Sequence, residues 1–123
     1  MRVTNLRMVV ETVADHGAGQ LVPGNTLLVS AFPVAITLNV RIRYDGVIPP
    51  DHAVEAAVEA PSGSVADKAW AYTGKQQAAH GEVKVSMKFT AYEAGVYTTR
   101  ATVNNQDVPP KRLEIRRSAP APR

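Results

Sequence analysis

The 123-residue chain contains no cysteine. Without cysteine there is no disulfide, no thiolate ligand for a metal and no cysteine nucleophile. Stability must therefore come from a hydrophobic core, and a chain of this length can bury roughly two-thirds of the surface that its unfolded form exposes. The hydrophobic content of 45% is sufficient for one such core. We expect one domain over residues 1–117, followed by a Pro- and Ala-rich basic tail over residues 118–123.

Long apolar runs are also absent. No stretch reaches the ~18 residues that a membrane-spanning helix needs, and we expect no membrane partner. Residues 1–16 contain neither an uninterrupted apolar segment nor a small-residue cleavage site, which are the marks of a secretory signal. The sequence therefore predicts a chain that is not secreted.

Positive charge is scarce outside the C-terminal segment. The formal net charge is +3, yet the first 110 residues contain one more acidic than basic side chain, and the excess of Lys and Arg begins at Lys111. Phosphate binding requires clustered Lys and Arg. We therefore do not expect the body of the protein to bind nucleic acid.

Alternation of apolar and polar side chains is the main pattern that is present. It is clearest over residues 34–44, where every second side chain from Val34 to Tyr44 is apolar. A period of two is typical of a strand with one face on a core and one in water. The same period predicts strands over residues 6–13, 27–32, 83–89, 97–103 and 112–116. Turn-forming residues favour a turn over 15–19, and another over 104–107 that continues through Pro109 and Pro110.

Residues 52–60 fit two structures. Alanine and glutamate favour a helix, whereas His52, Val54, Ala56, Val58 and Ala60 would share one face of a strand. Prolines bracket the segment on both sides and leave it short for a helix. We favour a strand, and we expect a further short edge strand around Trp70 and Tyr72.

About seven to eight short strands with Gly and Pro between them indicate an all-β protein, a two-sheet antiparallel sandwich. Glu93, Gly95 and Tyr97 sharpen this prediction, because Glu-x-Gly-x-Tyr resembles the tyrosine corner of immunoglobulin-like domains. In that motif the tyrosine hydroxyl forms a hydrogen bond with nearby backbone. Thr99 stands where an antibody domain has a cysteine, so the resemblance is to the immunoglobulin-like architecture and not to antibodies.

Most of the chain also resembles a bacterial and phage family of short proteins known only as a domain of unknown function. The similarity rests on the apolar segment 6–13, the Phe32-Pro33 step before the alternating segment 34–44, the Pro61-Ser62-Gly63 turn, and Gly95-Val96-Tyr97. The resemblance implies a sandwich and implies no activity. Abundant Ala and Val, with more Arg than Lys, is consistent with such a source.

Two groups of residues are candidates for partner binding. Trp70 and Tyr72 lie two apart and would share one side of a strand, where they would either cap the core or anchor a partner. The second group is basic and lies near the C-terminus: Lys111, Arg112, Arg116, Arg117 and Arg123. These residues would either contact an acidic neighbour or protect an edge strand from aggregation.

The sequence shows no pattern for catalysis or for a cofactor. The three histidines, His16, His52 and His80, are far apart, whereas a metal site needs several ligands at one point. The serines lie in no nucleophile motif, and no phosphate-binding glycine loop occurs. We therefore expect no catalytic residues, no metal and no cofactor.

We interpret the chain as a non-enzymatic, immunoglobulin-like structural module that associates with itself or with another protein. Its most concrete form is a bacteriophage particle component, in a tail or as a capsid decoration. The expected location is the bacterial cytoplasm or the phage virion. The alternative is a small-molecule or carbohydrate-binding module that uses Trp70 and Tyr72 as an aromatic platform.

Overall fold

The computed structural model describes residues 4–14, 19–22, 24–46, 53–72, 80–103 and 105–118. Strands and turns account for these residues, and none of them is helical. Within these ranges there is accordingly no helix that is long and apolar enough to cross a bilayer.

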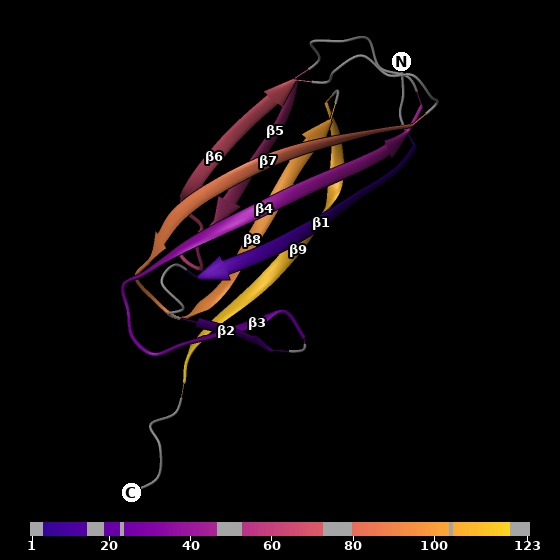
Figure 1. Ribbon diagram of the computed structural model, residues 1–123. Coiled ribbons are helices and arrows are strands. Elements are labelled where there is room, and N and C mark those ends of the chain that lie inside the picture. The colour runs from indigo at the N-terminus through magenta and orange to yellow at the C-terminus, as the bar shows by residue number, and fades with distance from the viewer. Residues whose placement is uncertain are drawn as a thin grey trace, which may run out of the picture.

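Nine strands form from the described residues (Figure 1). A three-stranded sheet has the order β1-β4-β7, and a six-stranded sheet has the order β2-β3-β9-β8-β5-β6. The strands are β1 (Thr4–Ala14), β2 (Gly19–Val22), β3 (Thr26–Val29), β4 (Val34–Asp45), β5 (Ala53–Glu59), β6 (Val65–Tyr72), β7 (His80–Ala91), β8 (Gly95–Val103) and β9 (Gln106–Arg117).

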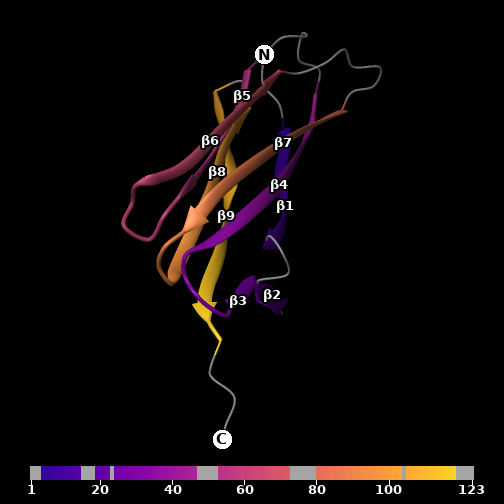
Figure 2. The same cartoon turned by 60° about the vertical axis from the view of Figure 1, so that its left-hand side comes forward.

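The two sheets stack face to face, with β7 close to β6 along one side and β1 close to β9 along the other. Figure 2 shows the two layers from the side. Burial alternates along β4, β5, β7 and β8, so that each strand gives one row of side chains to the space between the sheets. This space is the hydrophobic core; its largest fully buried side chains include Tyr44, Met8, Leu27, Ile36, Leu38 and Ile42.

The all-β, two-sheet sandwich expected from the alternation is confirmed. The segment over residues 52–60, which fitted either a strand or a helix, contains strand β5 between β8 and β6. Its valines, Val54 and Val58, are fully buried, whereas Glu55 is exposed. The period of two therefore outweighs the helix propensity of Ala and Glu, because it places both valines in the core.

Several expectations about strand limits and direction are wrong. The sheets are not wholly antiparallel, because β3 pairs in parallel with the end of β9. The strand expected over 27–32 ends at Val29, and Gly19, expected in a turn, begins β2. The other residues of that expected turn, 15–18, lie outside the described residues. The short hairpin of β2 and β3 extends the larger sheet beyond β9.

The last strand also differs from the expectation. Gln106 already pairs with Val103, so β9 begins at Gln106 and runs through Pro109 and Pro110. Proline lacks a backbone N–H, so a strand tolerates it where no neighbouring strand needs that hydrogen-bond donor. That condition holds here, since β3 pairs only with Glu114–Arg117 and leaves the proline-containing half paired with β8 alone. At Glu114 and Ile115, β9 pairs with β3 on one side and with β8 on the other, so it is not an edge strand there, as one of the two interpretations of the basic residues required.

Candidate functional site

Trp70 and Tyr72 lie on the outer face of β6, which forms one edge of the six-stranded sheet. Their exposed fractions are 60% and 67%. Along β6 the side chains of Ala69 and Ala71 turn the other way and pack against the core. The alternation that buries these small alanines leaves both aromatic rings in solvent, so the rings do not cap the core.

The register of β5 against β6 sets the neighbours of the two rings. Glu55 is opposite Trp70, and Ala53 is opposite Tyr72. Directly paired residues project from the same face of a sheet. Trp70 and Tyr72 therefore form an aromatic pair with a carboxylate beside one ring and a small methyl group beside the other; we call this surface the aromatic face.

A shallow hollow of about 360 Å³ lies on the same side of the sheet, across β5 from Trp70. Glu55, Arg100, Thr102 and Asp107 contribute polar side chains to its lining. Arg100 also forms an ion pair with Glu59, with Nε 2.6 Å from Oε1. Side chains of both charge signs and a hydroxyl are thus available beside an exposed indole ring.

A side chain of β6 binds the backbone of the other sheet. Asp67 accepts a hydrogen bond from the backbone N–H of Lys88 in β7, with an N–O distance of 3.0 Å. This contact joins the two sheets next to the aromatic face and satisfies a donor on the outer edge of β7. It helps to hold the strand that presents Trp70 and Tyr72.

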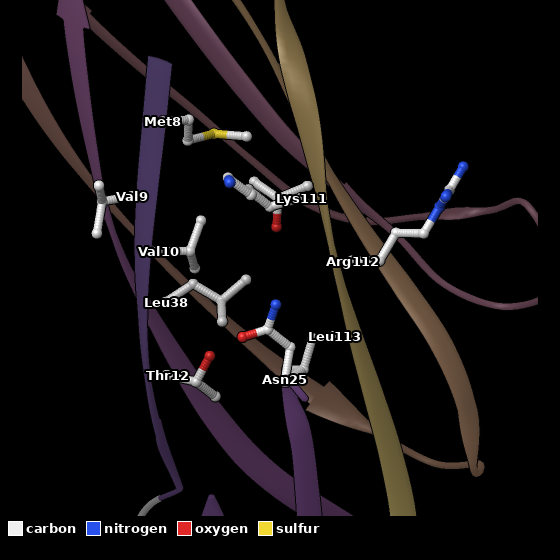
Figure 3. A pocket seen from close by; sticks show the side chains of 10 residues that line it. Met8, Val9, Val10, Thr12, Asn25, Leu38, Lys111, Arg112 and Leu113 are labelled. Carbon is white, nitrogen blue, oxygen red and sulfur yellow. The ribbon is translucent and has the colours of Figure 1, made fainter. Parts of the chain in front are cut away.

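The basic residues near the C-terminus do not form one cluster. Lys111 and Arg112 are neighbours on β9 and extend to opposite sides of it (Figure 3). Arg116 pairs with Glu114 on its own strand, and Arg117 is exposed at the end of β9. Arg123 lies outside the described residues. Ser118, next after β9, donates its backbone N–H to Val29 O at 2.8 Å.

A second hollow, of about 190 Å³, opens between β1 and β9 (Figure 3). Its apolar lining includes Met8, Val10, Leu38 and Leu113, and Lys111 lies on the same side of β9. Pockets for drug-sized ligands usually measure roughly 300–1,000 Å³. The hollow is smaller than these pockets, and the amine of Lys111 has no carboxylate or imidazole among the residues that line it.

Glu93, Gly95 and Tyr97 form the corner between β7 and β8. Tyr97 Oη donates a hydrogen bond to the backbone oxygen of Glu93 at 2.8 Å, which is the bond expected from the motif. Its buried ring stacks on Phe89 with the centroids 5.5 Å apart. Burial is the largest cause that raises the pKa of Tyr97, and the nearby Glu93 adds to it, while the backbone hydrogen bond opposes it. The hydroxyl thus stays protonated and structural.

Among the described residues, no three His, Asp or Glu side chains gather where they could hold a metal ion. His80 is exposed at the start of β7, and His16 and His52 lie outside the described ranges. Besides Tyr97, burial also raises the pKa of Tyr44, which is a core residue. Tyr97 lines a shallow hollow together with Ser62 and Ser64, but its hydroxyl is already bonded to the backbone of Glu93.

One charged surface was not found from the sequence. Arg7, Arg41, Arg43, Lys84 and Lys88 all lie on the outer face of the three-stranded sheet. Their positions in the alternating pattern already marked most of them as solvent-facing. The pairing of β1, β4 and β7 brings these five side chains together. The net charge of the first 110 residues does not reveal the cluster, because acidic side chains elsewhere in that segment balance its positive charge.

The fold and these surfaces define a two-layer β-sandwich with exposed binding candidates on the outer faces of both sheets. Comparisons with protein-family models, with curated proteins and with solved structures find no match to this chain.

Proposed function

We propose that this protein is a non-enzymatic, immunoglobulin-like module that associates with protein, first of all with a second copy of itself, through its aromatic face. The observation that carries the proposal is the exposure of Trp70 and Tyr72 side by side on a sheet-edge strand. Tryptophan and tyrosine are the residues most enriched where binding energy concentrates in interfaces.

The immunoglobulin-like part of the proposal is supported by topology and by the corner. In immunoglobulin domains the first, second and fifth strands share one sheet, and the third, sixth and seventh share the other. Here β1, β4 and β7 take the places of the first, second and fifth immunoglobulin strands, and β5, β8 and β9 take the places of the third, sixth and seventh. Strand β6 lies beside β5, where variable-type domains have an additional strand. Tyr97 lies near the start of β8, as the tyrosine of the corner does in the corresponding strand of that family.

We further propose a bacteriophage tail or capsid as the assembly, on the resemblance of the Phe32-Pro33 step and of Gly95-Val96-Tyr97 to motifs of a bacterial and phage family. The bacterial cytoplasm is then the compartment in which the chain folds. The aromatic face supports association in general, and the resemblance is the reason for this particular assembly.

Sedimentation velocity over a wide range of protein concentration tests the proposal. We expect the average mass of the wild type to rise with concentration and that of Trp70→Ala/Tyr72→Ala to remain at the monomer value. Tyr92→Ala is the matched control, because Tyr92 is similarly exposed and lies outside β6. A wild type that stays monomeric throughout contradicts self-association. Equal association of the wild type and the double variant excludes the aromatic face.

Carbohydrate binding is the second candidate, and the polar hollow beside Trp70 favours it. Sugars stack on aromatic rings while their hydroxyls bind carboxylates and guanidinium groups, and Glu55, Arg100 and Asp107 would supply these. Trp70 is the one tryptophan of the chain, so a change in its fluorescence reports directly on this site. Titration with neutral oligosaccharides should shift the emission, and Glu55→Ala/Asp107→Ala should weaken the binding. Unchanged emission across the panel would exclude this candidate.

A further inference from the structure

The outer face of the three-stranded sheet carries five cations from three strands, namely Arg7 on β1, Arg41 and Arg43 on β4, and Lys84 and Lys88 on β7. We call this surface the cationic face. All five residues are exposed. The acidic side chains among them include Glu11 and Glu82.

The register places like charges directly opposite each other in two places. Arg7 is paired with Arg43 across β1 and β4, and Arg41 is paired with Lys84 across β4 and β7. Like charges at directly opposed positions destabilise a sheet, whereas opposite charges stabilise it. These two like-charge pairs therefore oppose the folding of the isolated protein. Replacing one cation of a pair with an acidic residue would remove the repulsion within that pair.

Glu82 compensates the cluster only in part. Its carboxylate lies 3.0 Å from Arg43 Nε, 3.3 Å from Arg41 Nε and 3.9 Å from Lys84 Nζ. One negative charge among three positive charges leaves an excess of positive charge at this point. Because the side chains are about half exposed or more, that charge is available to a partner and is screened by salt.

Apolar side chains adjoin the cations. Val9 is 54% exposed and is paired with Arg41, and Val13 is 43% exposed and is paired with Thr37. A shallow hollow of about 400 Å³ is lined by Val9, Asn39, Arg41, Lys84 and Ser86, among others. An apolar centre with charged surroundings is the usual composition of a surface that binds protein.

We propose that the cationic face binds an acidic surface of a partner protein, whose carboxylates occupy the positions that Glu82 leaves uncompensated. A polypeptide fits better than a nucleic acid for two reasons. The aromatic residues of these strands, Tyr44 and Phe89, are buried and cannot stack on bases. The exposed side chains of Val9 and Val13 can pack against apolar side chains of a protein, whereas a sugar–phosphate backbone offers them no such contact.

This proposal does not depend on the function proposed above, because the aromatic face belongs to the other sheet. A molecule with both faces would bind two chains at once from its two sides. It would then link components of an assembly.

The charge reversal Lys84→Glu distinguishes a binding role from a structural one. It replaces the like-charge pair of Arg41 and Lys84 with a pair of opposite charges, and it also removes the ion pair of Lys84 with Glu82. Because these two effects oppose each other, the urea midpoint of the free protein should stay close to that of the wild type. The probe for binding is poly-L-glutamate, measured by fluorescence anisotropy at low and physiological salt. We expect Lys84→Glu to weaken this binding at least tenfold, and added salt to weaken the binding of the wild type.

Two controls complete the experiment. Lys68→Glu makes the same change of charge on the outer face of β6, and Trp70→Ala/Tyr72→Ala removes the aromatic face; each should change poly-L-glutamate binding less than twofold. Binding of poly-L-glutamate that is unchanged by Lys84→Glu, or equal weakening by Lys68→Glu, would overturn the proposal. Tighter binding of a thymidine oligonucleotide with the same number of charges would overturn it in favour of nucleic acid.

Discussion

At the scale of single residues, the hydroxyl of Tyr97 is the polar group on which the corner between β7 and β8 depends. Its hydrogen bond to Glu93 O spans four residues, so the bond holds the corner closed and fixes the first residues of β8. The ring itself is anchored by the core and by Phe89. Replacement of the hydroxyl alone therefore isolates the hydrogen bond from the packing.

We predict that Tyr97→Phe lowers the free energy of unfolding by about 1–2 kcal/mol, because a partly buried hydrogen bond is lost and Glu93 O loses its donor. Tyr92→Phe removes an exposed hydroxyl and should change the value by less than about 0.5 kcal/mol. Urea titrations followed by far-ultraviolet circular dichroism measure both. Equal effects for the two variants would contradict the role of the corner hydrogen bond.

The buried tyrosines also make stability depend on alkaline pH. Burial raises the pKa of Tyr44 and of Tyr97 above the ordinary value near 10. As pH rises past that value, the unfolded chain loses these protons before the folded protein does, so the unfolded state binds fewer protons and stability falls.

We therefore predict that the contribution of these two tyrosines to the free energy of unfolding is constant below this region and decreases as pH rises above about 10 toward the raised pKa values. Tyr44→Phe/Tyr97→Phe should show a smaller decrease than the wild type. Urea midpoints measured at several alkaline pH values test this, and a midpoint that rises over the same range would contradict it.

The sequence predicted the residue-scale features that are local. Tyr97 and Glu93 are four residues apart, so the motif itself contains both partners. The exposure of Trp70 and Tyr72 could not be predicted from the sequence in this way. A period of two shows that both rings share one face of a strand, but the packing of the sheets determines which face is buried.

At the scale of elements, Gly95 determines how β8 leaves the corner. Its φ is +143°, and an added Cβ would lie 2.5 Å from Pro61 Cγ in the turn between β5 and β6. Two turns at the same end of the sandwich are thus in close contact. A side chain at this position would meet both backbone strain and a steric clash.

We predict that Gly95→Ala destabilises the protein by roughly 2–4 kcal/mol, the sum of backbone strain and overpacking. Gly63→Ala is a matched control, because its φ is +89° and an added Cβ meets nothing within 4 Å. It should cost only the strain, about 1–2 kcal/mol. Thermal unfolding of both variants measures the difference. Equal losses would show that the contact with Pro61 contributes nothing.

The sequence predicted the long strands better than their ends. Residues 34–44 were recognised because one face is fully buried, and β4 extends only one residue further. The start of β9 was missed because Pro109 and Pro110 indicate a loop. They fit within a strand here because that half of β9 has β8 as its strand partner and leaves the other side open. This condition depends on the position of β3, which comes from the opposite end of the sequence.

At the scale of the whole molecule, distant pairings bring the binding surfaces together. The cationic face needs β1, β4 and β7 in one sheet, and the aromatic face needs β5 and β6 in the other. Alternation predicts which side chains of each strand face water, but it carries no information about which strands are neighbours. Both faces depend on a single core between the sheets, so we expect both to be lost when that core unfolds.

We predict that Leu38→Ala, at the centre of β4, lowers the free energy of unfolding by about 2–5 kcal/mol, because it leaves a cavity beneath both neighbouring strands of the smaller sheet. The unfolding should remain a single transition, since β4 carries both β1 and β7. Circular dichroism measures the sheets, and Trp70 fluorescence should change little because the ring is already exposed. Val13→Ala, an exposed site on the same sheet, should change stability by less than about 0.5 kcal/mol. Separate transitions for the two sheets, or equal effects of the two substitutions, would contradict a single shared core.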